Sequence, residues 1–184
     1  LSGGNFHGEP IAIAMDTLGI AMAELANISE RRTAKLIDPA TNEGLPAFLI
    51  DPAMAGLHSG LMISQYTAAA LVSENKILAH PASVDSIPTS ANQEDHVSMG
   101  TIAARKAVEI IKNVENVFAI EFLTACQAID FRGSAKLGNK TKKVYSFIRK
   151  HVTYVSKDRE LSLDIFKLKT LLGMKNTPID SLIS

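Results

Sequence analysis

The residues whose types best suit chemistry lie together in the polar segment from residue 81 to 99. The segment reads PASVDSIPTSANQEDHVSM and includes the cluster Asn92, Gln93, Glu94, Asp95 and His96. Long apolar stretches flank it on both sides. A buried amide or carboxylate without a partner costs about 2 kcal/mol or more, so these side chains should bind one another or a ligand. We therefore expect a functional loop between two buried helices.

Glu94 is the strongest catalytic candidate in this cluster. The amide side chains of Asn92 and Gln93 beside it can orient a carboxylate or a substrate. A simpler interpretation explains the same residues, because Asn92 or Asp95 can cap the N-terminus of a helix that follows. The residues alone leave both interpretations open.

Other kinds of site find little support in the sequence. The five histidines show no His-x-x-x-His spacing and the single cysteine allows no Cys-x-x-Cys, so we expect no metal centre. Cys126 lies in an apolar stretch, where a thiol usually packs in the core rather than acting as a nucleophile. The chain also has no G-x-S-x-G, no phosphate-binding loop and no dinucleotide-binding fingerprint.

Composition argues against nucleic acid and membrane as partners. The chain of 184 residues has 19 basic and 19 acidic residues, and we interpret the basic residues between 136 and 150 as a solvated helix face. The apolar stretch from 11 to 28 approaches membrane-spanning length, but Asp16 and Glu24 interrupt it, so we expect a buried helix instead. A single cysteine agrees with a reducing, cytoplasmic setting.

Apolar periodicity predicts an all-α fold in which helices position the polar segment. The first helix should begin at Pro10, the second should span 59–80, and the third should run from about Asp95 to Arg132 and end at Gly133. Residues 1–9 and 38–58 should be irregular, with 48–50 buried. The expected apolar stripes are Ile11, Met15, Leu18, Met22 and Leu25 on the first helix, Met62, Tyr66, Ala69 and Val72 on the second, and Val144, Ile148 and Val152 on a basic helix, followed by a last helix capped by Ser162. Because the first helix is apolar on several faces, and 46% of the chain is hydrophobic, we expect a homo-oligomer.

Four stretches of the sequence resemble one known family. They are residues 2–10 (SGGNFHGEP), 29–32 (SERR), 56–63 (GLHSGLMI) and 83–99 (SVDSIPTSANQEDHVSM). Together they closely resemble the C-terminal part of the histidine ammonia-lyases, members of the aromatic amino acid lyase family. The resemblance covers nearly the whole chain and is strongest from Ser2 to Gly133.

The resemblance implies a long-helix bundle of the L-aspartase-like type and a homotetramer. It also implies elimination of ammonia from L-histidine to give trans-urocanate, a step of histidine catabolism. The family's electrophile, 4-methylideneimidazol-5-one (MIO), is built from an internal Ala-Ser-Gly, which does not occur in these 184 residues. MIO is therefore expected from an N-terminal half of the lyase, and the isolated chain is expected to be inactive.

The resemblance also assigns roles to individual residues. Phe6 resembles the phenylalanine that packs beside the electrophile and the substrate. Glu94 resembles the active-site glutamate of histidine-specific members, where phenylalanine-specific relatives tend to have glutamine. Its expected role is to orient the imidazole or to take part in deprotonating the amine, and both remain open. Gln93 and Asn92 are the expected partners of that carboxylate in substrate binding.

These expectations give a domain organisation and two functional hypotheses. Residues 1–133 should form the lyase part with its active-site loop at 81–99, and residues 134–184 a C-terminal helical segment. The first hypothesis is a part of a histidine ammonia-lyase, favoured by Phe6 and Glu94. The second is a catalytically inactive helical module that keeps the fold for self-association, favoured for the isolated chain by the absence of Ala-Ser-Gly.

Overall fold

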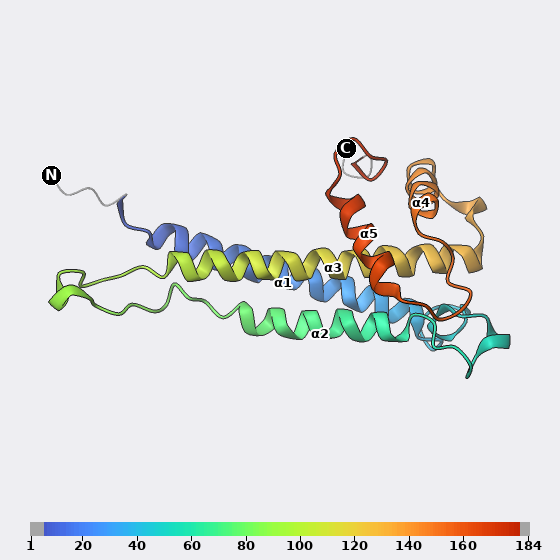
Figure 1. Cartoon of the computed structure of the whole chain (residues 1–184), viewed down its shortest axis with the longest axis horizontal. Coiled ribbons are helices and arrows are strands. Elements are labelled where there is room, and N and C mark those ends of the chain that lie inside the picture. Colours follow the sequence, from blue (N-terminus) through green and yellow to red (C-terminus); the bar gives the residue numbers. More distant parts are fainter. Residues whose placement is uncertain (1–5, 181–184) are drawn as a thin grey trace. The chain divides into compact units, whose positions relative to one another are not determined.

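The described chain folds into helices joined by loops. The structure, a computed structural model, describes residues 6–180, and over this range it contains no β-strand (Figure 1). The α-helices are α1 (Glu9–Ile37), α2 (Met62–Leu78), α3 (Gly100–Arg132), α4 (Asn139–His151) and α5 (Leu161–Gly173). Short 3-10 helices lie at Ala47–Leu49, Pro52–Met54, Ser90–Asn92 and Ser134–Lys136. The predicted all-α class is confirmed, while the part of the predicted loop at residues 1–5 lies outside the described residues.

The helices divide into two compact units. The first unit is formed by residues 1–27 and 71–114, and the second by 28–70 and 115–184. The predicted end of the third helix is confirmed, since α3 ends at Arg132 and Gly133 adopts a φ of +84°. The proposed division into a lyase part and a C-terminal segment at residue 133 stays a prediction about function.

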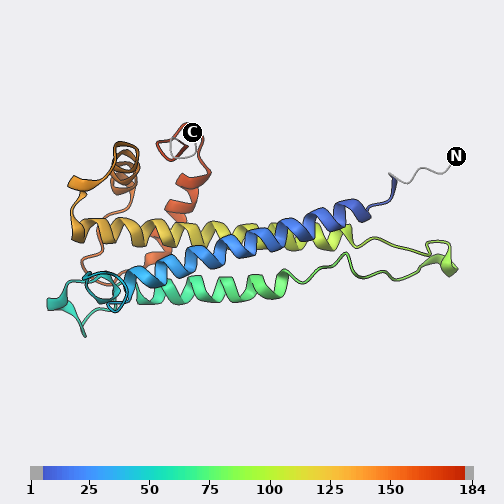
Figure 2. The same cartoon turned by 180° about the vertical axis from the view of Figure 1, so that it is seen from behind.

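The first unit packs helices through small residues. Within it, the N-terminal part of α1 lies along the N-terminal part of α3 (Figures 1 and 2). A Cβ on Gly19 of α1 would lie 3.1 Å from the Cδ1 of Ile110 on α3, so the close approach depends on glycine. Ala12 on α1 and Ala103 and Ala107 on α3 are likewise buried.

The faces that α1 and α2 bury differ from the predicted ones. In α1 the small and polar residues Ala12, Asp16 and Ala26 are buried, whereas Ile11 and Leu25 of the predicted stripe are exposed. In α2 the buried residues are Leu61, which precedes its first turn, and Ser64, Ala68, Val72 and Asn75, while Tyr66 is exposed. Small residues permit closer backbone approach than large ones, so they form the helix contacts within the chain. The large apolar side chains of α1 remain exposed.

Asp16 anchors the base of the polar segment to the helices of the first unit. Its buried carboxylate accepts a hydrogen bond of 2.7 Å from the backbone N–H of Ser83. The ammonium of Lys106 on α3 lies 3.5 Å from the same carboxylate and also donates to the carbonyl of His80. Although burial raises the pKa of Asp16, the hydrogen bonds from Ser83 and the charge of Lys106 outweigh it and lower that pKa overall. The start of the polar segment is therefore held in place against α1 and α3.

The second unit contains a larger apolar core around the C-terminal part of α3. The predicted burial of Leu49 and Ile50 is confirmed, as is the predicted face of α4 with Val144 and Ile148. Cys126 is 3% exposed, and burial raises its pKa to about 11, so it is a core thiol as predicted. The cap predicted at Ser162 was wrong: α5 begins at Leu161, and the Ser162 hydroxyl donates to the Glu160 side chain instead.

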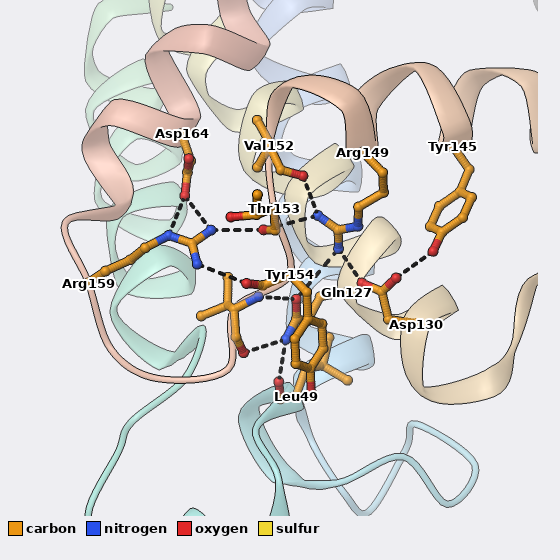
Figure 3. Close-up of polar contacts among 11 residues, drawn as sticks. Leu49, Gln127, Asp130, Tyr145, Arg149, Val152, Thr153, Tyr154, Arg159 and Asp164 are labelled. Atoms are coloured by element: carbon orange, nitrogen blue, oxygen red, sulfur yellow. Dashed lines mark hydrogen bonds and ion pairs between the residues drawn. The ribbon is translucent and has the colours of Figure 1, made fainter.

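A buried amide ties the C-terminal segment of the second unit to α3. Figure 3 shows Gln127 between two backbone segments. Its Nε2 donates to the carbonyl of Leu49 at 3.1 Å and to that of Val155 at 2.9 Å, and its Oε1 accepts from the Val155 N–H at 3.0 Å. Asp130 beside it pairs with Arg149 and accepts a hydrogen bond from Tyr145. Gln127 thus saturates its polar atoms inside the core, as burial requires.

Candidate active site

The polar loop, residues 81–99, leaves the helix ends of the first unit and turns back at residues 90–92 (Figures 1 and 2). An isolated antiparallel bridge closes the turn, where the Thr89 N–H donates to the Glu94 carbonyl at 3.1 Å. Farther down the loop, the Val97 N–H donates to the hydroxyl of Ser86 at 2.9 Å. These bonds give the loop a defined shape although it has no regular secondary structure around them.

Three consecutive residues at the turn adopt a left-handed backbone. The φ angles of Ser90, Ala91 and Asn92 are +50°, +54° and +70°. Non-glycine residues pay about 1–2 kcal/mol each for this conformation. Such strain is concentrated at functional sites in proteins, where the surrounding structure holds it. The turn therefore supports a functional interpretation of the residues that follow it.

Glu94 is exposed immediately after the strained turn. The hydroxyl of Thr89 donates to its Oε2 at 3.2 Å. A hydrogen bond from the Ser90 side chain, with a smaller one from Thr89, lowers the pKa of Glu94 below its usual range. Glu94 is therefore an ionised, accessible carboxylate at neutral pH.

The capping interpretation of this cluster was wrong. α3 begins at Gly100, five residues later than predicted, so neither Asn92 nor Asp95 is close enough in sequence to cap it. Asn92 instead belongs to the short 3-10 helix at the turn. Asn92 and Gln93 are exposed, and the side chains bonded to Glu94 are those of Thr89 and Ser90. Those hydroxyls were missed because Ser and Thr occur throughout the segment, so their positions in the sequence gave no signal.

Phe6 lies just before α1 and is 97% exposed. The described residues show no direct contact between Phe6 and Glu94. Their neighbours do meet: the ring of His7 stacks on that of His96, with centroids 5.3 Å apart and an interplanar angle of 9°. The structure thus brings the Phe6 segment and the polar loop together in one unit, through residues that the sequence analysis did not single out.

The arrangement can supply two walls of a pocket. An aromatic ring and an ionised carboxylate both face outward from neighbouring segments of the first unit. A groove of about 720 Å³ at the starts of α1 and α3 is lined by Gly8, Ser98, Thr101 and Arg105 among others, but by neither Phe6 nor Glu94. Among residues 6–180 no three His, Cys, Asp or Glu side chains gather as a metal site would require.

Comparisons with known proteins identify the family of the chain. The sequence profile described as "Aromatic amino acid lyase" matches residues 1–150. The chain is 64% identical to histidine ammonia-lyase of Treponema denticola over 173 aligned residues. The alignment covers 94% of this chain and 34% of that protein. The chain therefore spans about a third of the length of the curated relatives it matches.

Solved structures show the same fold. The crystal structure of histidine ammonia-lyase from Trypanosoma cruzi matches with a TM-score of 0.88 and 51% sequence identity, covering 94% of this chain and 34% of that one. Phenylalanine aminomutase from Pantoea agglomerans matches with a TM-score of 0.91 and 36% identity, covering 97% of this chain and 34% of that one. The profile match over most of the chain, the high identities and the common helical fold show that this chain belongs to the aromatic amino acid lyase family.

Proposed function

We propose that the chain is part of a histidine ammonia-lyase, which eliminates ammonia from L-histidine to give trans-urocanate. The observation that carries the proposal is the accessible, ionised Glu94 on a loop held against the Phe6 segment. The 64% identity to the histidine ammonia-lyase of Treponema denticola supports histidine as the substrate. The rest of the pocket comes from the N-terminal half of the lyase.

Glu94 acts on the polar end of the substrate in this proposal. A carboxylate stabilises the protonated form of a nearby imidazole or ammonium group and can accept a proton from it. The hydrogen bonds from Ser90 and Thr89 that lower the pKa of Glu94 favour its ionised form, which suits the stabilisation of a protonated group. Asn92 and Gln93 are exposed beside it and are available to donate hydrogen bonds to the substrate.

Phe6 provides the apolar wall in this proposal. An aromatic ring that is 97% exposed fits against a flat partner, and its face would exclude water there. The partner that fits is MIO, which is formed from an Ala-Ser-Gly outside this chain. Phe6 would pack beside it. When present, MIO supplies an electrophile that captures histidine, whose amine is a poor leaving group and whose β-hydrogen is weakly acidic.

The proposed assembly is a cytoplasmic homotetramer. α1 is long and apolar enough to cross a bilayer, but Asp16 and Lys106 form a polar pair at its inner face, which favours a protein environment. Its outer face exposes Ile11, Ile13, Leu18, Ile20, Leu25 and Ile28. An apolar surface of this extent supports burial against other subunits.

The same exposed face supports the second candidate function, an inactive module that only self-associates. Activity of a complete enzyme separates the two. Residues 1–184 joined to the N-terminal part of the Treponema denticola relative should convert histidine to urocanate, followed by ultraviolet absorbance. A well-folded tetramer without activity would favour the inactive module.

Glu94→Gln tests the catalytic role in that complete enzyme. It keeps the shape of the side chain and removes the charge, so we expect kcat to fall by about 100-fold, as for removal of a positioned acid–base group. Asp95→Asn is the matched control in the same loop and should change kcat by less than about threefold. If Glu94→Gln instead lowers the melting temperature and leaves kcat intact, Glu94 is structural.

A further inference from the structure

We propose that His7 is a positioning residue that locks the polar loop to the Phe6 segment through one neutral tautomer of its imidazole. The inference deepens the proposed function and rests on it, because it concerns how Phe6 and Glu94 are held relative to each other. It concerns a residue that touches neither the substrate nor the reacting atoms.

The hydrogen bonds of His7 define its protonation state. Its Nδ1 lies 3.2 Å from the backbone nitrogen of Glu9, which can only donate. Its Nε2 lies 2.9 Å from the backbone oxygen of His96, which can only accept. Nδ1 must therefore be the acceptor and Nε2 must carry the hydrogen. Only the neutral Nε2–H tautomer satisfies both bonds.

The bond to Glu9 fixes the ring to the start of α1. Glu9 is the first residue of α1, and the backbone N–H groups of the first turn have no partner inside a helix. Nδ1 accepts one of them.

The bond to His96 fixes the ring to the polar loop. It reaches a backbone atom across 89 positions of sequence, two residues after Glu94. The ring of His96 also stacks on the ring of His7. The single side chain of His7 therefore connects the start of α1 to the polar loop.

The backbone next to His7 makes the same junction tight. A Cβ on Gly8 would lie 2.6 Å from the Ser98 hydroxyl oxygen, and a Cβ on Gly100 would lie 3.3 Å from the Gly8 carbonyl oxygen. Glycine at both positions lets the two segments approach. Residues 7–8 and 96–100 thus form one contact region. Phe6 directly precedes its first segment, and Glu94 lies two residues before its second segment.

The consequence for the site is geometric. If the bridge is lost, the segment that bears Phe6 and the loop that bears Glu94 lose the side-chain contact between them. Misplacement of a catalytic group by about 1 Å can cost about 100-fold in rate. His7→Ala should therefore lower kcat of the complete enzyme at least about tenfold, with a smaller change in KM.

Two conservative variants separate bridging from helix capping. The terminal amide of His7→Gln can place a donor near the position of Nε2, whereas the shorter His7→Asn can accept only from the Glu9 N–H. Bridging predicts that His7→Gln restores kcat to within about threefold and that His7→Asn does not. A capping role alone predicts the reverse order. His151→Ala removes an exposed histidine at the end of α4, away from the bridge, and serves as the control, with a change below about threefold.

Hydrogen–deuterium exchange of the same complete enzyme gives a readout independent of activity. His7→Ala should speed exchange in peptides from residues 86–99 and leave peptides from α4 unchanged. If the unsubstituted enzyme is inactive, the proposed function fails. The exchange result still shows whether His7 holds the loop to the start of α1. Unchanged exchange in the loop, or rescue by His7→Asn but not by His7→Gln, would overturn the proposal.

Discussion

At the scale of single residues, two side chains that hold the segments around the site do so through backbone partners. The carboxylate of Asp16 accepts from the Ser83 N–H, and Nε2 of His7 donates to the His96 carbonyl. Sequence patterns identify polar residues but not the backbone atoms they will meet after folding. Glu94 and Phe6 could be proposed from motifs, whereas the roles of His7 and Asp16 required coordinates.

Asp16→Asn should destabilise the chain by about 2–3 kcal/mol, because it leaves Lys106 beside an uncharged amide and weakens the acceptor for Ser83. Urea unfolding of the complete enzyme measures the change. Glu24→Gln on the exposed side of the same helix is the control and should alter stability by less than about 0.5 kcal/mol. Equal effects of the two substitutions would show that the anchor contributes nothing.

The same carboxylate predicts a dependence on acid. The folded-state pKa of Asp16 lies below its unfolded value of about 3.9. Its stabilising contribution is therefore fully present above that unfolded value and is lost as the pH falls through the lower folded pKa. The Asp16→Asn variant should lose less stability than the unsubstituted protein over this acidic range. Parallel loss of stability in the two proteins would contradict the assignment.

At the scale of elements, the existence of the helices was predictable and their inner faces were not. The C-terminal end of α3 before Gly133 and the apolar face of α4 follow from local sequence. Most of the predicted stripe on α1 did not face the chain's own core, because Gly19 and small neighbours allow closer packing there, and on α2 only Val72 of the predicted stripe is fully buried. Hydrophobic periodicity shows which face seeks burial but not which partner covers it.

The left-handed turn of the polar loop gives a prediction at this scale. Ala91→Gly should leave the free energy of unfolding unchanged or raise it by up to about 1 kcal/mol, since glycine adopts a φ of +54° without strain. Ala125→Gly inside α3 is the matched control and should destabilise by about 1 kcal/mol. Calorimetry of both variants measures this, and a large loss for Ala91→Gly would show that the turn is not strained.

At the scale of the whole molecule, the exposed apolar face of α1 carries the proposed subunit association. Ile13 is 53% exposed, and a charge there should weaken subunit association of the complete enzyme, measured by sedimentation velocity. Ile13→Glu should shift the tetramer toward smaller species. Phe166→Glu places the same charge on an exposed site of α5 and should leave the tetramer intact. If both variants dissociate the tetramer equally, the exposed face of α1 has no particular role in subunit association.

The central claim is that Phe6 and Glu94 line one pocket completed by the rest of the lyase. The most direct measurement is a crystal structure of the complete enzyme with an unreactive histidine analogue bound. We expect the Glu94 carboxylate within hydrogen-bonding distance of the imidazole or amine, and the Phe6 ring in contact with the ligand. A ligand bound elsewhere, with Glu94 in solvent on the outer surface of the assembly, would contradict the account.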